Sequence, residues 1–227
     1  MTEDKFYEKS IKSDTIYDGK ILKLRVDTVE LVNKKYSKRE IVDHQKGVGI
    51  IAFDEDNKLW MVKQYRKAID KVTLEIPAGL VESNELPIET AKRELQEEIG
   101  FYPEKISYLF DMHASPGFTN DKLSFFLAKN LVKSELEQDE DENVEASLYE
   151  IDDLYNMIEN GELTDAKSII AILYAMKLEN EKQWFKYRTR GLYRPFWFAI
   201  KTYRKKENRY IWYKHWRNNK FLSKRNQ

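Results

Sequence analysis

The 227-residue chain has no cysteine, five prolines and eight glycines. The absence of cysteine excludes disulfide bonds, thiolate zinc sites and thiol nucleophiles, and it suits a reducing cytosol. So few prolines and glycines exclude a collagen-like or low-complexity chain. Hydrophobic residues make up 41% of the sequence, which is enough to form a sizeable core, so we expect a folded globular protein.

Long hydrophobic runs are also missing. Residues 1–14 are polar and charged and lack the apolar stretch of a signal peptide. The longest mainly apolar runs, Leu123–Ala128 and Leu192–Ile200, are far shorter than the ~20 residues that a transmembrane helix needs. These absences predict a soluble, cytoplasmic protein.

The two charge signs are unevenly distributed although the formal net charge is zero. Residues 181–227 contain 15 Lys/Arg and 2 Asp/Glu, whereas residues 1–180 contain 24 and 37. Four of the five tryptophans also lie in 181–227. Together with the strand pattern below, this shift predicts N-terminal strands over 1–44, a central domain over 45–180 and a basic aromatic extension over 181–227.

Alternating apolar and polar residues predict strands along most of the chain. Residues 21–32 and 39–44 predict an N-terminal hairpin, and Gly47–Phe53 and Lys58–Tyr65 flank the turn-forming Asp54–Asn57 as a second hairpin. Further extended segments are expected at 74–77, 106–113, 122–129 and 144–151, and closing helices at 152–160 and 165–181. This order predicts a mixed α+β layered domain.

One central helix is predicted between Pro87 and Gly100. Proline suits the first turn of a helix and glycine suits the position after its end. Between them, one apolar stripe is formed by Ile88, Ala91, Leu95 and Ile99.

Three carboxylates share a side of this helix. Glu94 and Glu98 are four residues apart and Glu97 is three from Glu94, so their like charges destabilise the helix unless a cation lies between them. Oxygen ligands of this kind suit Mg²⁺. A solvated charged helix is the alternative, because Arg93 is spaced to pair with Glu89 and Glu97.

The glutamates belong to a longer pattern. Gly79, Glu85 and the segment Arg93–Phe101 stand at the spacing of the Nudix hydrolase signature, which the sequence resembles at every fixed position. The resemblance implies a Nudix α/β/α sandwich over 45–180 that hydrolyses a nucleoside diphosphate linked to a second group. It also implies Mg²⁺, or Mn²⁺, as cofactor.

The resemblance further implies roles for single residues. Glu94 and Glu98 are implied as metal ligands, with the Ala78 carbonyl as a third. Such metals neutralise the diphosphate and lower the pKa of a bound water.

Four other residues of the signature region receive implied roles. Glu97 is a further ligand or the base, and Arg93 orients the glutamates. Glu85 and Glu82 lie near the metals as outer or alternate ligands, and Glu82 is also counted with the substrate-binding residues.

The flanking segments resemble the ADP-ribose pyrophosphatase branch of the family. They are Gln64–Arg66, Leu74–Gly79, Ser115–Phe118 and Gly161–Ser168, and the resemblance covers roughly residues 20–175. It implies that ADP-ribose and water give AMP and ribose 5-phosphate, and that the protein is a homodimer whose N-terminal strands help build the partner's site.

Within that branch, Arg39 and Arg66 are implied to contact the diphosphate or terminal ribose, and Pro116 marks the substrate loop. Arginine suits this role because its fork pairs with phosphate oxygens, although each could instead form a surface salt bridge. Relatives often carry a catalytic glutamate five residues after this proline. Here the position is Asp121, one methylene shorter, so either it or Glu97 is the base, or Asp121 is an ordinary loop residue.

Residues 181–227 lie outside the resemblance. Their cations and aromatic rings could bind an anionic membrane surface, bind nucleic acid, or pack on the acidic part of the chain, the last being favoured by the opposite charges. For the whole protein, hydrolysis of another nucleoside diphosphate derivative and non-catalytic sensing of ADP-ribose are the alternatives to ADP-ribose hydrolysis.

Overall fold

The computed structural model describes residues 5–137 and 143–189. The first of two compact units in the chain ends at Gln183 and contains every strand reported below. Of the predicted basic aromatic extension, residues 190–227 lie outside the described residues. Within the described ranges, no helix is both long and apolar enough to cross a membrane.

The N-terminal part is a three-stranded antiparallel sheet of β1 (Lys9–Asp18), β2 (Leu22–Glu30) and β3 (Tyr36–His44). The sequence predicts β2 and β3 as a hairpin but not β1. All ten residues of β1 are exposed, so the strand carries no alternation of buried and exposed positions that a sequence pattern could reveal.

A mixed four-stranded sheet forms the centre of the molecule. Its order is β7 (Ala78–Leu80), β4 (Gly47–Ala52), β9 (Lys122–Lys133) and β8 (Phe101–His113). The pair β4–β9 is parallel, and the other two pairs are antiparallel.

The predicted hairpin between β4 and β5 (Leu59–Arg66) is wrong in its pairing. The turn forms, since the Lys58 amide donates to Asp54 Oδ1 at 2.7 Å, but one bridge between Phe53 and Leu59 is the only pairing across it in the described chain. β5 instead pairs with β6 (Lys71–Glu75) and β10 (Glu145–Tyr149). β4 is buried along its whole length because its two neighbours are β7 and β9.

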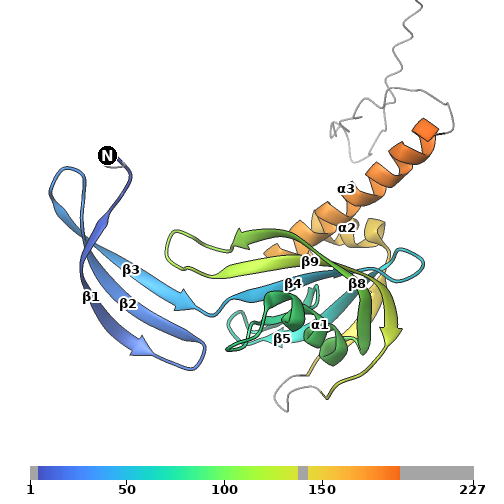
Figure 1. Ribbon diagram of the computed structural model, residues 1–227, viewed down its shortest axis with the longest axis horizontal. Helices are drawn as coiled ribbons and strands as arrows, with labels where there is room; N and C mark the ends of the chain where they lie inside the picture. The colour runs from blue at the N-terminus through green and yellow to red at the C-terminus, as the bar shows by residue number, and fades with distance from the viewer. Residues whose placement is uncertain (1–4, 138–142, 190–227) are drawn as a thin grey trace, which may run out of the picture. The chain divides into compact units, whose positions relative to one another are not determined.

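The helices cover both faces of the central sheet (Figure 1). On one face, α1 (Pro87–Glu98) packs Ala91 and Leu95 against Val48 and Ile50. On the other face, α2 (Ile151–Glu159) and α3 (Ala166–Thr189) pack on a second cluster that includes Ile51, Leu154 and Ile172. Alternate residues of β4 thus enter different cores, which gives the predicted α/β/α sandwich.

The ends of α1 agree with the sequence pattern. Pro87 is its first residue, Ile99 is the C-cap, and Gly100 follows with φ of 77°, a left-handed conformation that favours glycine. The helix α1 contacts β7. Its defined ends and this contact determine which of its side chains face β7.

Candidate active site

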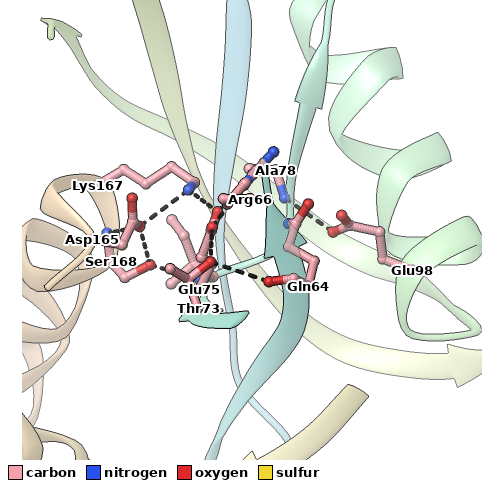
Figure 2. Close-up of polar contacts among 10 residues, drawn as sticks. Gln64, Arg66, Thr73, Glu75, Ala78, Glu98, Asp165, Lys167 and Ser168 are labelled. Carbon is pink, nitrogen blue, oxygen red and sulfur yellow. Dashed lines mark hydrogen bonds and ion pairs between the residues drawn. The ribbon is translucent and has the colours of Figure 1, made fainter. Parts of the chain in front are cut away.

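The carboxylates of α1 lie against the short strand β7. Glu94 and Glu98 are buried, next to the fully buried Leu95, and Glu97 is partly exposed. Glu98 Oε2 accepts a hydrogen bond from the Ala78 amide at 3.0 Å, as Figure 2 shows. The apolar stripe of α1 thus brings these acids to the backbone of Ala78.

Gly79 lies directly against Glu94. A Cβ built at residue 79 would overlap the Glu94 carboxylate, so a side chain there would displace it. Glu94 and Glu98 therefore approach the two consecutive residues Ala78 and Gly79.

Arg93 binds the acids that surround it. Its Nη1 lies 2.7 Å from Glu97 Oε2 and 2.8 Å from Glu94 Oε1, and its Nε donates to Glu85 Oε1 at 3.1 Å. Burial lowers the pKa of Arg93, but the hydrogen bonds to Glu85 and the charges of Glu94 and Glu97 outweigh burial and raise it. Hydrogen bonds from Arg93 likewise hold the pKa of Glu85 below its usual value.

A second charged group lies beside this one. Arg66, at the end of β5, donates from Nε and Nη2 to the two carboxylate oxygens of Glu75, both at 2.7 Å. The Thr73 hydroxyl donates to the same carboxylate at 2.5 Å, and Lys167 of α3 forms an ion pair with it. Burial raises the pKa of Glu75, but the bonds from Arg66 and the charge of Lys167 outweigh it and bring this pKa to about 2.

The start of α3 holds the chain between Glu75 and Ala78. The Ile76 amide donates to the buried Ser168 hydroxyl at 2.8 Å, and Ser168 is in turn bound to Asp165 (Figure 2). Sequence reasoning noted both segments but gave no role to Glu75, Lys167 or Ser168. The available signal was a glutamate inside an otherwise apolar extended segment, Leu74–Pro77.

Comparison with known proteins identifies the family. The NUDIX domain matches residues 43–171. The chain belongs to the Nudix family.

Two relatives and one solved structure illustrate the similarity. The methanol dehydrogenase activator of Bacillus methanolicus is 43% identical over 171 residues, covering 74% of this chain and 92% of the relative. The ADP-ribose pyrophosphatase of Bacillus subtilis is 41% identical over 169 residues, covering 74% and 91%. A crystal structure of an ADP compounds hydrolase superposes with a TM-score of 0.71 at 20% identity, covering 80% of this chain and 98% of the other, which shows the shared fold.

The Nudix helix supplies the donor chemistry of a hard metal ion. Glu94, Glu97 and Glu98 are oxygen donors on one helix, with Glu98 bound to Ala78 and Glu94 against Gly79, and Mg²⁺ and Mn²⁺ prefer such ligands. In the part of the chain that the structure describes, no three acidic or histidine side chains meet at one point as a metal cluster. Glu94 and Glu97 instead contact Arg93, and Glu98 contacts Ala78, so the donor set fits a metal that would compete with these contacts.

The remaining acid of the signature region is less enclosed. Glu82 is exposed, and its backbone amide lies 3.4 Å from Glu85 Oε2. The Thr90 hydroxyl binds the same Glu85 oxygen at 2.7 Å, so Glu85 is held between the loop and α1.

The loop with Pro116 and Asp121 is attached to β3. Phe118 accepts a hydrogen bond from the Val42 amide at 2.8 Å, and the Asn120 side chain accepts from the His44 amide at 2.8 Å. Pro116 is exposed, and Asp121 Oδ1 lies 3.6 Å from His44 Nδ1.

The position of Asp121 along the sheet follows from the strand register, since it directly precedes β9. Gly49 pairs with both Ala78 and Phe125, so Asp121 lies four strand positions, roughly 13 Å, from the level of Ala78. Along the sheet, Asp121 is thus offset from the position where Glu98 meets Ala78.

Arg39 lies in the N-terminal sheet, on β3. It pairs with Glu8 through Nε at 2.9 Å and Nη2 at 2.5 Å, and its other bonds go to Ser37 and Lys38. Within the described residues, all hydrogen bonds of the Arg39 side chain go to the N-terminal sheet or to Glu8, which directly precedes it.

Proposed function

We propose that this Nudix protein hydrolyses the diphosphate bond of ADP-ribose, with Mg²⁺, to AMP and ribose 5-phosphate. The observation that carries the proposal is the approach of Glu94 and Glu98 to Ala78 and Gly79, with the cationic Arg66 nearby. An acidic metal-binding side beside a phosphate-binding cation is what cleavage of a diphosphate requires. The similarity to the Bacillus subtilis ADP-ribose pyrophosphatase supports this substrate.

Nudix hydrolases generally need divalent metal ions. Glu94, Glu98 and the Ala78 carbonyl would hold the ion here, with Glu97 and Glu85 as further ligands. Such an ion supplies neutralisation of the diphosphate and a more acidic bound water. Arg93 contributes by orienting Glu85, Glu94 and Glu97, each of which it contacts through its guanidinium.

Arg66 is the proposed diphosphate-binding residue. Among the described residues, its bonds use Nε and Nη2 and leave Nη1 without a hydrogen-bond partner, and its side chain is 43% exposed. Hydrogen bonding to Glu75 raises the pKa of Arg66, as do the charges of Asp165 and Glu98. Its guanidinium therefore stays charged and can donate to phosphate oxygens from the unused edge. Pro116 and Glu82 complete the proposed substrate contacts.

Glu97 and Asp121 are the two candidates for accepting the proton of the attacking water. Glu97 belongs to the helix that carries Glu94 and Glu98, whereas Asp121 lies on the loop that is attached to β3. Proton transfer requires hydrogen-bond reach, so the geometry favours Glu97.

The N-terminal sheet is proposed to join two copies of the chain. β1 exposes Ile11, Ile16 and Tyr17, apolar side chains that a second copy could cover. Arg39 lies in this sheet, where it pairs with Glu8. In the dimer, we propose that it reaches the substrate of the partner copy. Sedimentation of the full chain should give twice the 27.2 kDa monomer mass.

The decisive assay measures AMP release from ADP-ribose with Mg²⁺, with and without a chelator. We expect metal-dependent turnover that Glu98→Gln reduces by roughly 100-fold or more, because the carboxylate charge is lost while an oxygen that can accept from the Ala78 amide remains. Glu89→Gln on the exposed side of α1 is the matched control and should keep turnover. Binding of ADP-ribose without hydrolysis would favour the sensor alternative, and turnover of a different nucleotide derivative would change the assigned substrate.

A second candidate function comes from the relative that is 43% identical, whose name is methanol dehydrogenase activator. By that similarity, this protein would raise the activity of a methanol dehydrogenase. Adding wild type and Glu98→Gln to such a dehydrogenase separates an effect that needs hydrolysis from one that needs only binding.

Two further parts of the proposal concern the setting of the enzyme. A sequence without cysteine suits the reducing cytoplasm, where we place the reaction. The basic residues of 181–227 would contact the acidic part of the chain, an anionic membrane surface or nucleic acid.

A further inference from the structure

The start of α3 reaches the proposed diphosphate site through one buried carboxylate. Lys167 Nζ pairs with Glu75, and the same nitrogen lies 3.0 Å from Asp165 Oδ2. Glu75 is 2% exposed and Lys167 has a side chain that is 12% exposed, whereas the Arg66 side chain is 43% exposed. Glu75, in the middle of the line Lys167–Glu75–Arg66, is therefore the most buried of the three, and Arg66 is the most exposed.

The arrangement fixes the direction of the Arg66 guanidinium. Two parallel bonds to Glu75 hold one edge of the planar group, so the opposite edge, with Nη1, can face only away from Glu75. Figure 2 shows Arg66 between Glu75 on one side and Ala78 with Glu98 on the other.

The same helix turn also fixes the backbone that leads to Ala78. Ser168 Oγ accepts from the Ile76 amide, two residues before Ala78 and one after Glu75. Lys167 and Ser168 thus act on both partners of the proposed site: on Arg66 through Glu75, and on Ala78 through the chain.

We propose that Lys167 and Ser168 are positioning residues that hold Arg66 toward the diphosphate of the substrate. The inference deepens the proposed function and rests on it for the identity of the ligand. Buried ion pairs are poor sources of stability, because removing charges from water costs about as much as the pairing returns. A network of this kind beside an exposed arginine is better explained by orientation, since small displacements of a contact residue lower turnover steeply.

The kinetic test compares Lys167→Met, Lys167→Arg and Ser168→Ala with wild type in ADP-ribose hydrolysis. Methionine resembles the aliphatic part of lysine but has no charge, so Glu75 loses one of the cations that hold it beside Arg66. We expect Lys167→Met to lower kcat/KM by about tenfold, mainly through a higher KM, and Lys167→Arg to recover most of it. Ser168→Ala should lower kcat/KM in the same direction, because the Ile76 amide loses its partner.

Lys63→Met is the control, because Lys63 lies on the same strand as Arg66 but is exposed and 4.0 Å from Glu145. It should leave kcat and KM unchanged. Equal kinetics for Lys167→Met and wild type, with wild type active, would overturn the positioning role and leave the proposed function intact.

A second measurement does not depend on turnover. In NMR spectra of the full chain, the Nε–H signal of Arg66, identified by its loss in Arg66→Lys, should exchange slowly with water in wild type. We expect exchange about tenfold faster in Lys167→Met and unchanged in Lys63→Met. Unchanged exchange in Lys167→Met would overturn the positioning role, whatever the substrate is. If exchange is faster in Lys167→Met but wild type does not hydrolyse ADP-ribose, only the assigned substrate would be wrong.

Discussion

The positions of some residues of the site can be predicted from the neighbouring sequence, and those of others cannot. Glu94 and Glu98 are spaced on one helical face with an apolar stripe beside them, so their burial against β7 follows from periodicity. Glu75 has no such pattern, because its partner Lys167 is 92 residues away in the chain. The sequence therefore predicted the acids of α1, but it could not predict the support of Arg66.

The low pKa of Glu75 gives a prediction for stability in acid. Because its pKa is about 2 in the folded protein and near 4.5 when unperturbed, ionised Glu75 stabilises the fold above pH 4.5 relative to its protonated form. That contribution falls as the pH drops from about 4.5 to about 2, and its upper size is of order 3 kcal/mol.

The measurement is urea denaturation of wild type and Glu75→Gln at several pH values between 7 and 2.5. We expect Glu75→Gln to be less stable at pH 7 because Arg66 and Lys167 lose a charged partner, and the gap should narrow toward pH 2.5. Glu159→Gln, at the end of α2, should run parallel to wild type. A gap that is constant with pH would show that the charge of Glu75 is not what stabilises the site.

At the scale of elements, the helix α1 could be predicted and the pairing of the strands only in part. Local signals, Pro87 and Gly100, mark both ends of α1. The parallel pair β4–β9 joins residues more than seventy positions apart, and no turn links the two strands directly. The turn at Asp54–Asn57 is a correct local prediction that did not determine which strand β5 would join.

The loop that carries Asp121 is attached to β3 by backbone hydrogen bonds to Val42 and by the side chain of Asn120. Asn120 Oδ1 accepts from the His44 amide and its Nδ2 donates to Asp43 Oδ1 at 2.9 Å. Asn120→Ala removes both bonds, each worth about 1 kcal/mol, so the loop should open more often.

Hydrogen exchange followed by mass spectrometry checks this prediction. Exchange in peptides that cover 42–44 and 115–121 should be at least about tenfold faster in Asn120→Ala than in wild type. Asn33→Ala, which removes a comparable bond at the exposed turn between β2 and β3, should leave those peptides unchanged. Wild-type exchange in Asn120→Ala would mean that the backbone bond between Val42 and Phe118 is enough to hold the loop.

At the scale of the whole molecule, the sequence predicts two parts of opposite charge. Residues 1–180 have a net charge of −13 and residues 181–227 a net charge of +13. If the basic part binds an outside polyanion, the full chain should be retained on anionic liposomes or on a single-stranded oligonucleotide, and retention should weaken with salt.

The comparison is with a chain that ends at Thr189, which keeps α3 whole. Loss of retention in this variant, with unchanged hydrolysis of ADP-ribose, would assign the partner to residues 190–227. No retention of the full chain on either surface would leave packing on the acidic part as the remaining interpretation. Neutral liposomes of the same size provide the control.

The bonds from Ser168 to Ile76 and from Lys167 to Glu75 also determine how this protein can recombine with its relatives. A crossover anywhere between residues 77 and 164 separates these partners and pairs β6 of one parent with α3 of the other. A chimera of that kind can keep both cores and still misplace Arg66. Shuffled libraries built from this chain should therefore give active members chiefly when residues 73–78 and 165–168 come from the same parent.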